Sequence, residues 1–110
     1  MKVRITSVRQ TEYTDLMARY ENPIEHACDM TVGQEWVSVD GQRPEGFCPT
    51  AWESVAPFAI ALARGESNFF DGWMRNPRSA MVSCNDGFRP MSFYLEAQGK
   101  QSPDDGGNVS

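Results

Sequence analysis

The segment CPTAWESVAPFAIALARG, residues 48–65, restricts the fold of this chain most, because it has the residue spacing of one long helix. Arginine and then glycine at residues 64–65 are a typical stop signal for a helix. Four apolar residues recur at three- and four-residue spacing: Trp52, Val55, Ala59 and Leu62. This spacing gives a helix a single apolar stripe, which is buried from water only when it packs on another element. The sequence therefore predicts one main helix that covers a neighbouring layer.

The start and the middle of this helix carry further signals. Thr50 and Glu53 match a capping box, in which each side chain accepts a hydrogen bond from the backbone N–H of the other residue. Alternatively, Pro49 is the first helical residue and Cys48 is the cap. Pro57 has no backbone N–H to donate, so we expect it to kink the helix or to split it in two.

The segments around the helix have the patterns of strands and turns. In KVRITSV, Val3, Ile5 and Ser7 alternate with polar residues and share one face. Thr14 is placed to cap a short helix that ends before Pro23. Three more segments read as strands, the last two joined by a tight connection: EWVSVDG, SAMVSC and RPMSFYLEA. We expect an α+β fold, with a small, mostly antiparallel sheet of about four strands, the main helix on one face and one short helix.

Length and composition set the domain organisation and exclude some partners. A chain of 110 residues has room for one core, which we place in residues 1–98, and the polar tail 99–110 is predicted to be disordered. A formal net charge of −5 counts against nucleic-acid binding and against docking on an anionic membrane. No apolar run reaches the ~20 residues of a spanning helix. The N-terminal residues lack the apolar centre of a secretion signal, so we expect a cytoplasmic protein.

Three cysteines, an odd number at wide spacing, indicate free thiols in a reducing compartment. Cys48 stands at the start of the main helix, where unpaired amides and the helix dipole favour the reactive thiolate. Cys84 ends a predicted strand, close to Asp86 and Arg89. The alternative for each is ordinary: a buried cysteine is a common core residue, and Asn-Asp-Gly is what a turn needs.

The only histidine, His26, lies two residues before Cys28. Together with Cys48 and Cys84 they would form a Cys₃His set for a soft metal such as Zn, Fe or Cu. The sequence has no Cys-x₂-Cys pair, the usual arrangement in structural zinc sites, so only the fold could bring these ligands together. It also lacks the G-x-S-x-G element of Ser-His-Asp hydrolases and a phosphate-binding glycine loop.

The segment ESNFFDGWMRNP holds Phe69, Phe70, Trp73 and Met74, more apolar area than a loop normally leaves in water. We expect these side chains to fold back over the core. Two alternatives are a subunit contact and a ligand pocket beside the main helix, with Trp52 at its wall and Arg89 as an anion anchor.

The cysteine segments resemble a family of small, uncharacterised bacterial and archaeal proteins, grouped as a domain of unknown function. The likeness rests on Cys28 followed by TVGQEW, on Cys48-Pro49 at a helix start, and on Cys84-Asn85-Asp86 with Arg89-Pro90. It covers roughly residues 3–96. This chain differs at Asp29, where the family pattern has a proline, and in FFDGWMRNP, which replaces a shorter aromatic segment. The resemblance implies the fold outline and the pairing of thiol segments, and no activity.

Two functions follow as hypotheses. The first is a thiol-centred site in which Cys48 and Cys84 carry the chemistry, with Cys28 and His26 as further metal ligands; it would bind a soft metal or do redox or nucleophilic chemistry. The second is a non-catalytic homo-oligomer or accessory subunit that uses residues 69–74 as its interface. No motif in the sequence identifies a substrate.

Overall fold

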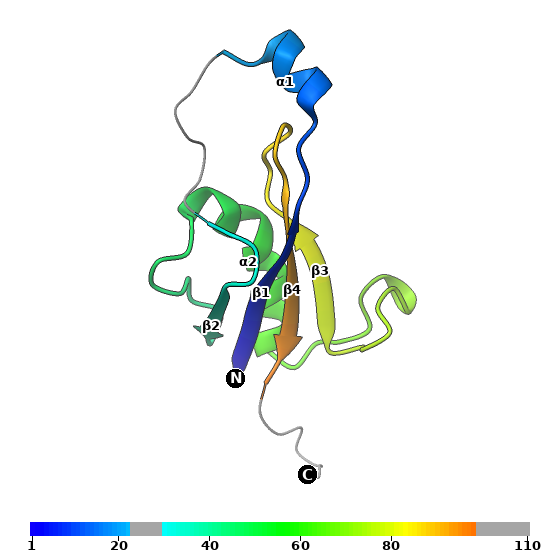
Figure 1. Cartoon of the computed structure of the whole chain (residues 1–110). Coiled ribbons are helices and arrows are strands. Elements are labelled where there is room, and N and C mark those ends of the chain that lie inside the picture. The colour runs from blue at the N-terminus through cyan, green and yellow to red at the C-terminus, as the bar shows by residue number, and fades with distance from the viewer. Residues whose placement is uncertain (23–29, 99–110) are drawn as a thin grey trace.

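Four antiparallel strands form one open sheet in the order β2-β1-β4-β3, and two helices complete the α+β fold that the sequence predicts (Figure 1). The computed structural model describes residues 1–22 and 30–98, so the predictions for His26, Cys28 and the tail 99–110 lie outside the described residues. The elements are β1 (Lys2–Gln10), α1 (Thr14–Tyr20), β2 (Glu35–Val39), α2 (Pro49–Ala63), the 3₁₀ turn η1 (Phe69–Asp71), β3 (Ser79–Ser83) and β4 (Met91–Ala97).

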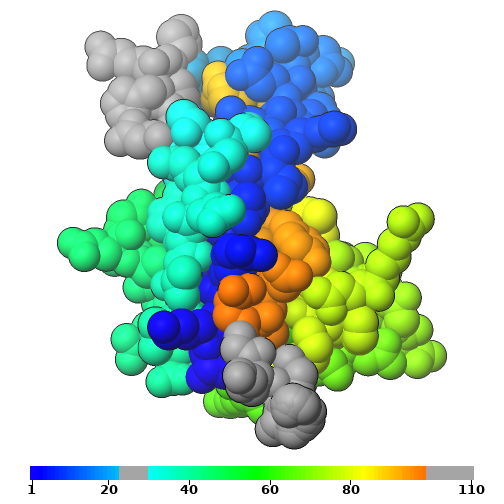
Figure 2. Space-filling view, turned by 60° about the horizontal axis from the view of Figure 1, so that its bottom comes forward, coloured from blue at the N-terminus to red at the C-terminus, as the bar shows by residue number. Residues whose placement is uncertain are grey.

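The two central strands come from opposite ends of the described chain. Val3 in β1 lies opposite Ser38 in β2 and Ala97 in β4, and the register shifts between Ser7 and Arg9. Because side chains alternate along a strand, this register places Val3 and Ser7 on the face covered by α2, where both are buried as predicted. Within the described residues, no helix covers the opposite face: Figure 2 shows β2 in cyan to turquoise, β1 in blue, β4 in orange and β3 in yellow side by side on the surface.

Helix α2 packs on the sheet through one stripe of small and branched residues. The buried positions are Ala51, Val55, Ala59 and Leu62. The predicted stripe is therefore right except at Trp52, which is only half-buried because Ala51 occupies the position that faces the sheet. Trp52 lies at the edge of the core, where its ring stands edge-on to Phe47 at 5.8 Å between centroids.

The start of α2 agrees with the second of the two predicted arrangements. Cys48 is the N-cap residue and Pro49 is the first helical residue, and no side chain caps the helix, so the capping box is not formed. The helix continues through Pro57 to Ala63 and is not split. Both Pro57 and Glu53, whose carbonyl loses its partner, are exposed, so water can take the missing hydrogen bond.

The predicted stop at residues 64–65 is confirmed by its hydrogen bonds. Gly65 has a φ of +91°, its N–H donates to the carbonyl of Leu62 (3.0 Å), and the N–H of Glu66 donates to the carbonyl of Ala61 (3.0 Å). These two bonds form a Schellman motif, which satisfies the last carbonyls of the helix.

Helix α1 projects from one end of the sheet, next to the connection between β3 and β4 (Figure 1). Its N-cap is Tyr13 rather than the predicted Thr14, and none of its residues is buried. The backbone N–H of Tyr13 donates to the carbonyl of Phe88 (2.9 Å), which attaches the start of α1 to that connection.

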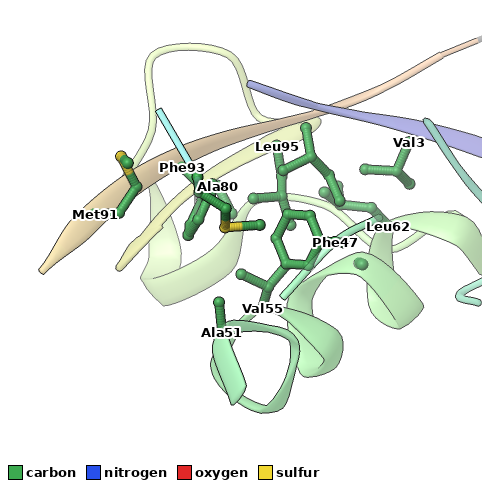
Figure 3. Close-up of a cluster of buried hydrophobic side chains, with 12 residues drawn as sticks. Val3, Phe47, Ala51, Val55, Leu62, Ala80, Met91, Phe93 and Leu95 are labelled. Carbon is green, nitrogen blue, oxygen red and sulfur yellow. The ribbon is translucent and has the colours of Figure 1, made fainter. Parts of the chain in front are cut away.

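An aromatic cluster fills the centre of the core between α2 and the sheet (Figure 3). Phe47, which is 1% exposed, lies 4.9 Å from Trp36 and 5.2 Å from Phe93 between ring centroids. The aliphatic residues of β1, β4 and α2 surround these rings. Two of the buried residues, Ala51 and Phe93, also line the space beside the start of α2.

Candidate functional site

A pocket of about 170 Å³ lies where α2 begins, beside the ends of β3 and β4, and both described cysteines line it. The volume is close to the ~150 Å³ of an engineered cavity that holds benzene, so the pocket suits an ion or a molecule of a few heavy atoms. Cys48 and Cys84 are far apart in the sequence, and the fold brings them to one place. Both are free and half-buried.

Cys48 reaches the pocket from the N-terminus of α2. Thr50 and Ala51, the next residues of the helix with an N–H, also line the pocket. The first N–H groups of a helix have no partner within it and carry the positive end of its dipole. Cys48 therefore lies next to the helix start, although its side chain makes no capping hydrogen bond there.

Cys84 is held at the pocket by backbone pairing between β3 and β4. Its N–H donates to the carbonyl of Met91 (3.0 Å), and the N–H of Met91 donates to Sγ of Cys84 (3.3 Å). Met91 also pairs with Gln10 of β1, which lines the pocket too. Gln10 of β1, Met91 of β4 and Cys84, the residue after β3, thus lie in one row at the end of the sheet.

The two charged residues of the pocket are already engaged with other groups. Oδ1 of Asp86 accepts hydrogen bonds from the backbone N–H groups of Phe88 (2.8 Å) and Arg89 (3.1 Å), the turn role expected for this segment. Arg89 donates both arms of its guanidinium to Glu21, at 2.8 and 3.0 Å. This hydrogen-bonded pair raises the pKa of Arg89 above its ordinary value, so the arginine stays charged. An anion in the pocket would have to compete with Glu21 for it.

Two methionines that sequence reasoning did not single out complete the pocket lining. Met30 is 8% exposed and Met91 is 3% exposed, and both line the same pocket as the two cysteines. Methionine is a common filler of irregular core space, so its presence in the sequence gives no signal of a site. Only the fold shows that four sulfur-bearing side chains share the pocket.

The aromatic segment forms a separate cluster on the far side of β3, where residues 66–78 project in Figure 2. Phe69 and Met74 are half-buried, as expected, but Phe70 is 73% and Trp73 is 42% exposed, so the prediction that all four fold over the core is wrong for these two. Phe58 of α2 is the centre of the cluster, with ring-centroid distances of 5.4 Å to Phe69, 6.2 Å to Phe70 and 6.1 Å to Trp73.

The predicted set of ligand or interface residues is therefore divided among three places. Phe69, Phe70 and Trp73 belong to the cluster on Phe58, Trp52 packs on Phe47, and Arg89 lies at the thiol pocket. Trp52 and Arg89 lie outside the cluster on Phe58, so these five residues do not form one ligand pocket.

The backbone of the aromatic segment is strained. Asn68, Phe70 and Asp71 all have a positive φ, between 52° and 57°, which is rare for any residue with a side chain and rarer for a bulky one such as Phe70. Two backbone hydrogen bonds hold the segment, from the N–H of Asn68 to the carbonyl of Pro77 (2.7 Å) and from that of Trp73 to Phe69 (3.1 Å). Strain of this kind persists only where surrounding contacts fix it, and it is frequent at functional sites.

Within residues 1–22 and 30–98, no three side chains of His, Cys, Asp or Glu gather as a metal cluster would require. The described residues of the predicted Cys₃His set are Cys48 and Cys84, and they line the same pocket. None of the helices in the described part of the chain has the length and apolar character to cross a bilayer.

Comparison of the chain with protein-family models, with curated proteins and with solved structures gave no match. The resemblance of the cysteine segments to an uncharacterised family therefore stays a prediction.

Proposed function

We propose that the pocket at the start of α2 is a thiol-centred site that binds a soft metal ion through Cys48 and Cys84. The observation that carries the proposal is that these two distant cysteines line one small pocket. Thiolate sulfur is a soft donor and prefers ions such as Zn²⁺ and Cu⁺ over hard ions such as Mg²⁺. Free thiols of this kind fit a reducing compartment, so we propose a cytoplasmic protein.

The surroundings of the two sulfurs support this function. The N–H of Met91 donates to Sγ of Cys84, and a hydrogen bond of this kind orients a sulfur that serves as a metal ligand. The sulfurs are half-buried, so an ion can enter from solvent and still be partly shielded from it.

Replacing either cysteine by serine is expected to weaken metal binding at least about 10-fold, because a thiolate ligand is lost and serine remains protonated at neutral pH. The measurement is titration of the reduced full chain with Cd²⁺, read as sulfur-to-metal charge-transfer absorption. Ser83→Ala, at the exposed position before Cys84, is the matched control and should bind as the wild type does. Wild-type protein that binds no Cd²⁺, Zn²⁺ or Cu⁺, or Cys→Ser variants that bind normally, would refute the metal site. Rapid alkylation of Cys48 in a wild type without metal affinity would point to nucleophilic chemistry instead.

A second candidate function is self-association through the aromatic cluster of Phe58, Phe69, Phe70 and Trp73. The specific observation in its favour is that Phe70, a large apolar side chain, is 73% exposed on a backbone with φ of +52°. Aromatic residues are enriched at protein interfaces, and homodimers are the commonest oligomers. We propose a second copy of the chain as the partner.

Under this second candidate, Phe70→Ala and Trp73→Ala are each expected to abolish self-association, because together the two rings form the exposed part of the cluster. Analytical ultracentrifugation should give the wild type a mass above 12.3 kDa and each variant the monomer mass. Tyr20→Ala, which removes another exposed ring on α1, is the control and should leave the assembly intact. A wild type that is monomeric at every accessible concentration contradicts this candidate.

A further inference from the structure

The thiol pocket contains a more specific donor set than two cysteines. Four of its lining residues carry sulfur, namely Cys48, Cys84, Met30 and Met91. They come from the start of α2, the end of β3, the residue five positions before β2 and the start of β4, so the folded chain alone brings them together. Both methionines are buried, and their exposed fractions are 8% and 3%.

The positions of Cys84 and Met91 are coupled most tightly. Cys84 and Met91 directly follow the last β3–β4 pair, Ser83 with Ser92, and are joined by the Cys84 N–H to Met91 carbonyl bond and by the Met91 N–H to Sγ bond. Opposed residues in an antiparallel pair point to the same side of the sheet, with Cβ atoms about 4.5–5.5 Å apart. Figure 3 shows Met91 at the edge of the buried cluster, on the side where α2 begins with Ala51. Met91 and Cys84 therefore line one pocket from adjacent positions.

The other charged groups of the pocket compete poorly with sulfur for a cation. Oδ1 of Asp86 already accepts two backbone hydrogen bonds, and Arg89 is a cation bound to Glu21. The remaining polar residues at the lining, such as Thr50 and Gln10, offer neutral oxygens, which suit hard ions that need several of them. Two thiols and two thioethers are thus the dominant donors.

We propose that this pocket is a copper(I) site, in which the thioethers of Met30 and Met91 and the thiolates of Cys48 and Cys84 coordinate the ion; the inference rests on the proposed thiol-centred function. Cu⁺ is the biological ion for which both thiolate and thioether are preferred ligands, whereas Zn²⁺ takes thiolate, imidazole and carboxylate. Binding releases the two thiol protons to solvent and changes no oxidation state.

The test is anaerobic titration of the reduced full chain with Cu⁺ against a colorimetric Cu⁺ chelator, with Cd²⁺ as the parallel probe of the thiols alone. Met30→Leu and Met91→Leu are each expected to weaken Cu⁺ binding about 10-fold or more while leaving Cd²⁺ affinity within about 2-fold. Leucine conserves volume, so these variants should fold. The control is Met81→Leu, which changes an exposed side chain of β3 outside the pocket lining and should change neither the Cu⁺ nor the Cd²⁺ affinity.

The outcomes separate the two proposals. In one outcome, the Met30→Leu Met91→Leu double variant binds Cu⁺ as the wild type does, while the cysteine variants lose Cu⁺ binding. That result would refute the thioether ligands and would leave the thiol site supported. If Cu⁺ affinity is unchanged in the cysteine variants as well as in the methionine variants, both the thiol-centred site and the copper(I) site are refuted. X-ray absorption of the copper complex provides an independent measurement: a first shell of sulfur alone is expected, and nitrogen or oxygen in that shell contradicts the assignment.

Discussion

Phe47→Ala is expected to lower the free energy of unfolding by about 3–5 kcal/mol, the range for removing a buried aromatic ring. Phe47 is 1% exposed and touches three other rings, those of Trp36, Trp52 and Phe93, at centroid distances of 4.9 to 5.8 Å. Its loss leaves a cavity that these large neighbours cannot fill without moving. Equilibrium unfolding in urea, followed by tryptophan fluorescence, measures the change.

Two further variants make the Phe47 result interpretable. Phe47→Leu retains much of the side-chain volume, so its free energy of unfolding should fall clearly less than that of Phe47→Ala. Tyr20→Ala removes a ring that is 67% exposed and should stay within about 0.5 kcal/mol of the wild type. A loss below about 1 kcal/mol for Phe47→Ala would mean that the core is not centred on this ring.

Gly41→Ala is expected to cost about 2–4 kcal/mol through two effects that act together. Gly41 has a φ of +80°, a conformation that strains any residue with a Cβ. An added Cβ would also lie 2.9 Å from Cγ1 and 3.3 Å from Cα of Ile60 in α2, so the turn after β2 and the helix would have to move apart. Thermal and urea unfolding of the variant measure the sum.

Gly46→Ala separates the two effects. Gly46 has nearly the same φ, +85°, but an added Cβ would meet nothing within 4 Å. Gly46→Ala is therefore expected to lower the free energy of unfolding by about 1–2 kcal/mol, through the strained backbone conformation alone. Equal losses in the two variants would show that the contact between Gly41 and Ile60 does not matter for stability.

The sequence was sufficient for the architecture because each element carries a local signal. The alternation of β1 places Val3 and Ser7 in the core, and Gly65 ends α2 with the expected hydrogen bonds. The errors come from competition between local options: Pro49 at the first helical position displaces the Thr50 capping box, and the smaller Ala51 takes the core position expected of Trp52.

The candidate site was only half predictable. The sequence places Cys48 at a helix start and Cys84 at a strand end, but their meeting depends on the strand order, which puts the start of β4 and the end of β3 beside the start of α2. The spacing of apolar residues within a segment does not indicate which distant segment it pairs with. The same holds for the ion pair of Glu21 and Arg89, and for Met30, whose role depends on what surrounds it.

The strand order also has a consequence for biosynthesis. Because β1 lies between β2 and β4, β1 lacks one of its two neighbours until β4 has been synthesised. Contacts between such distant segments fold slowly, since a long loop must close before they form. The nascent chain therefore carries β1 with one edge unpaired while the residues between β1 and β4 are synthesised, and the sheet, and with it the sulfur-lined pocket, is completed only after β4 has been made.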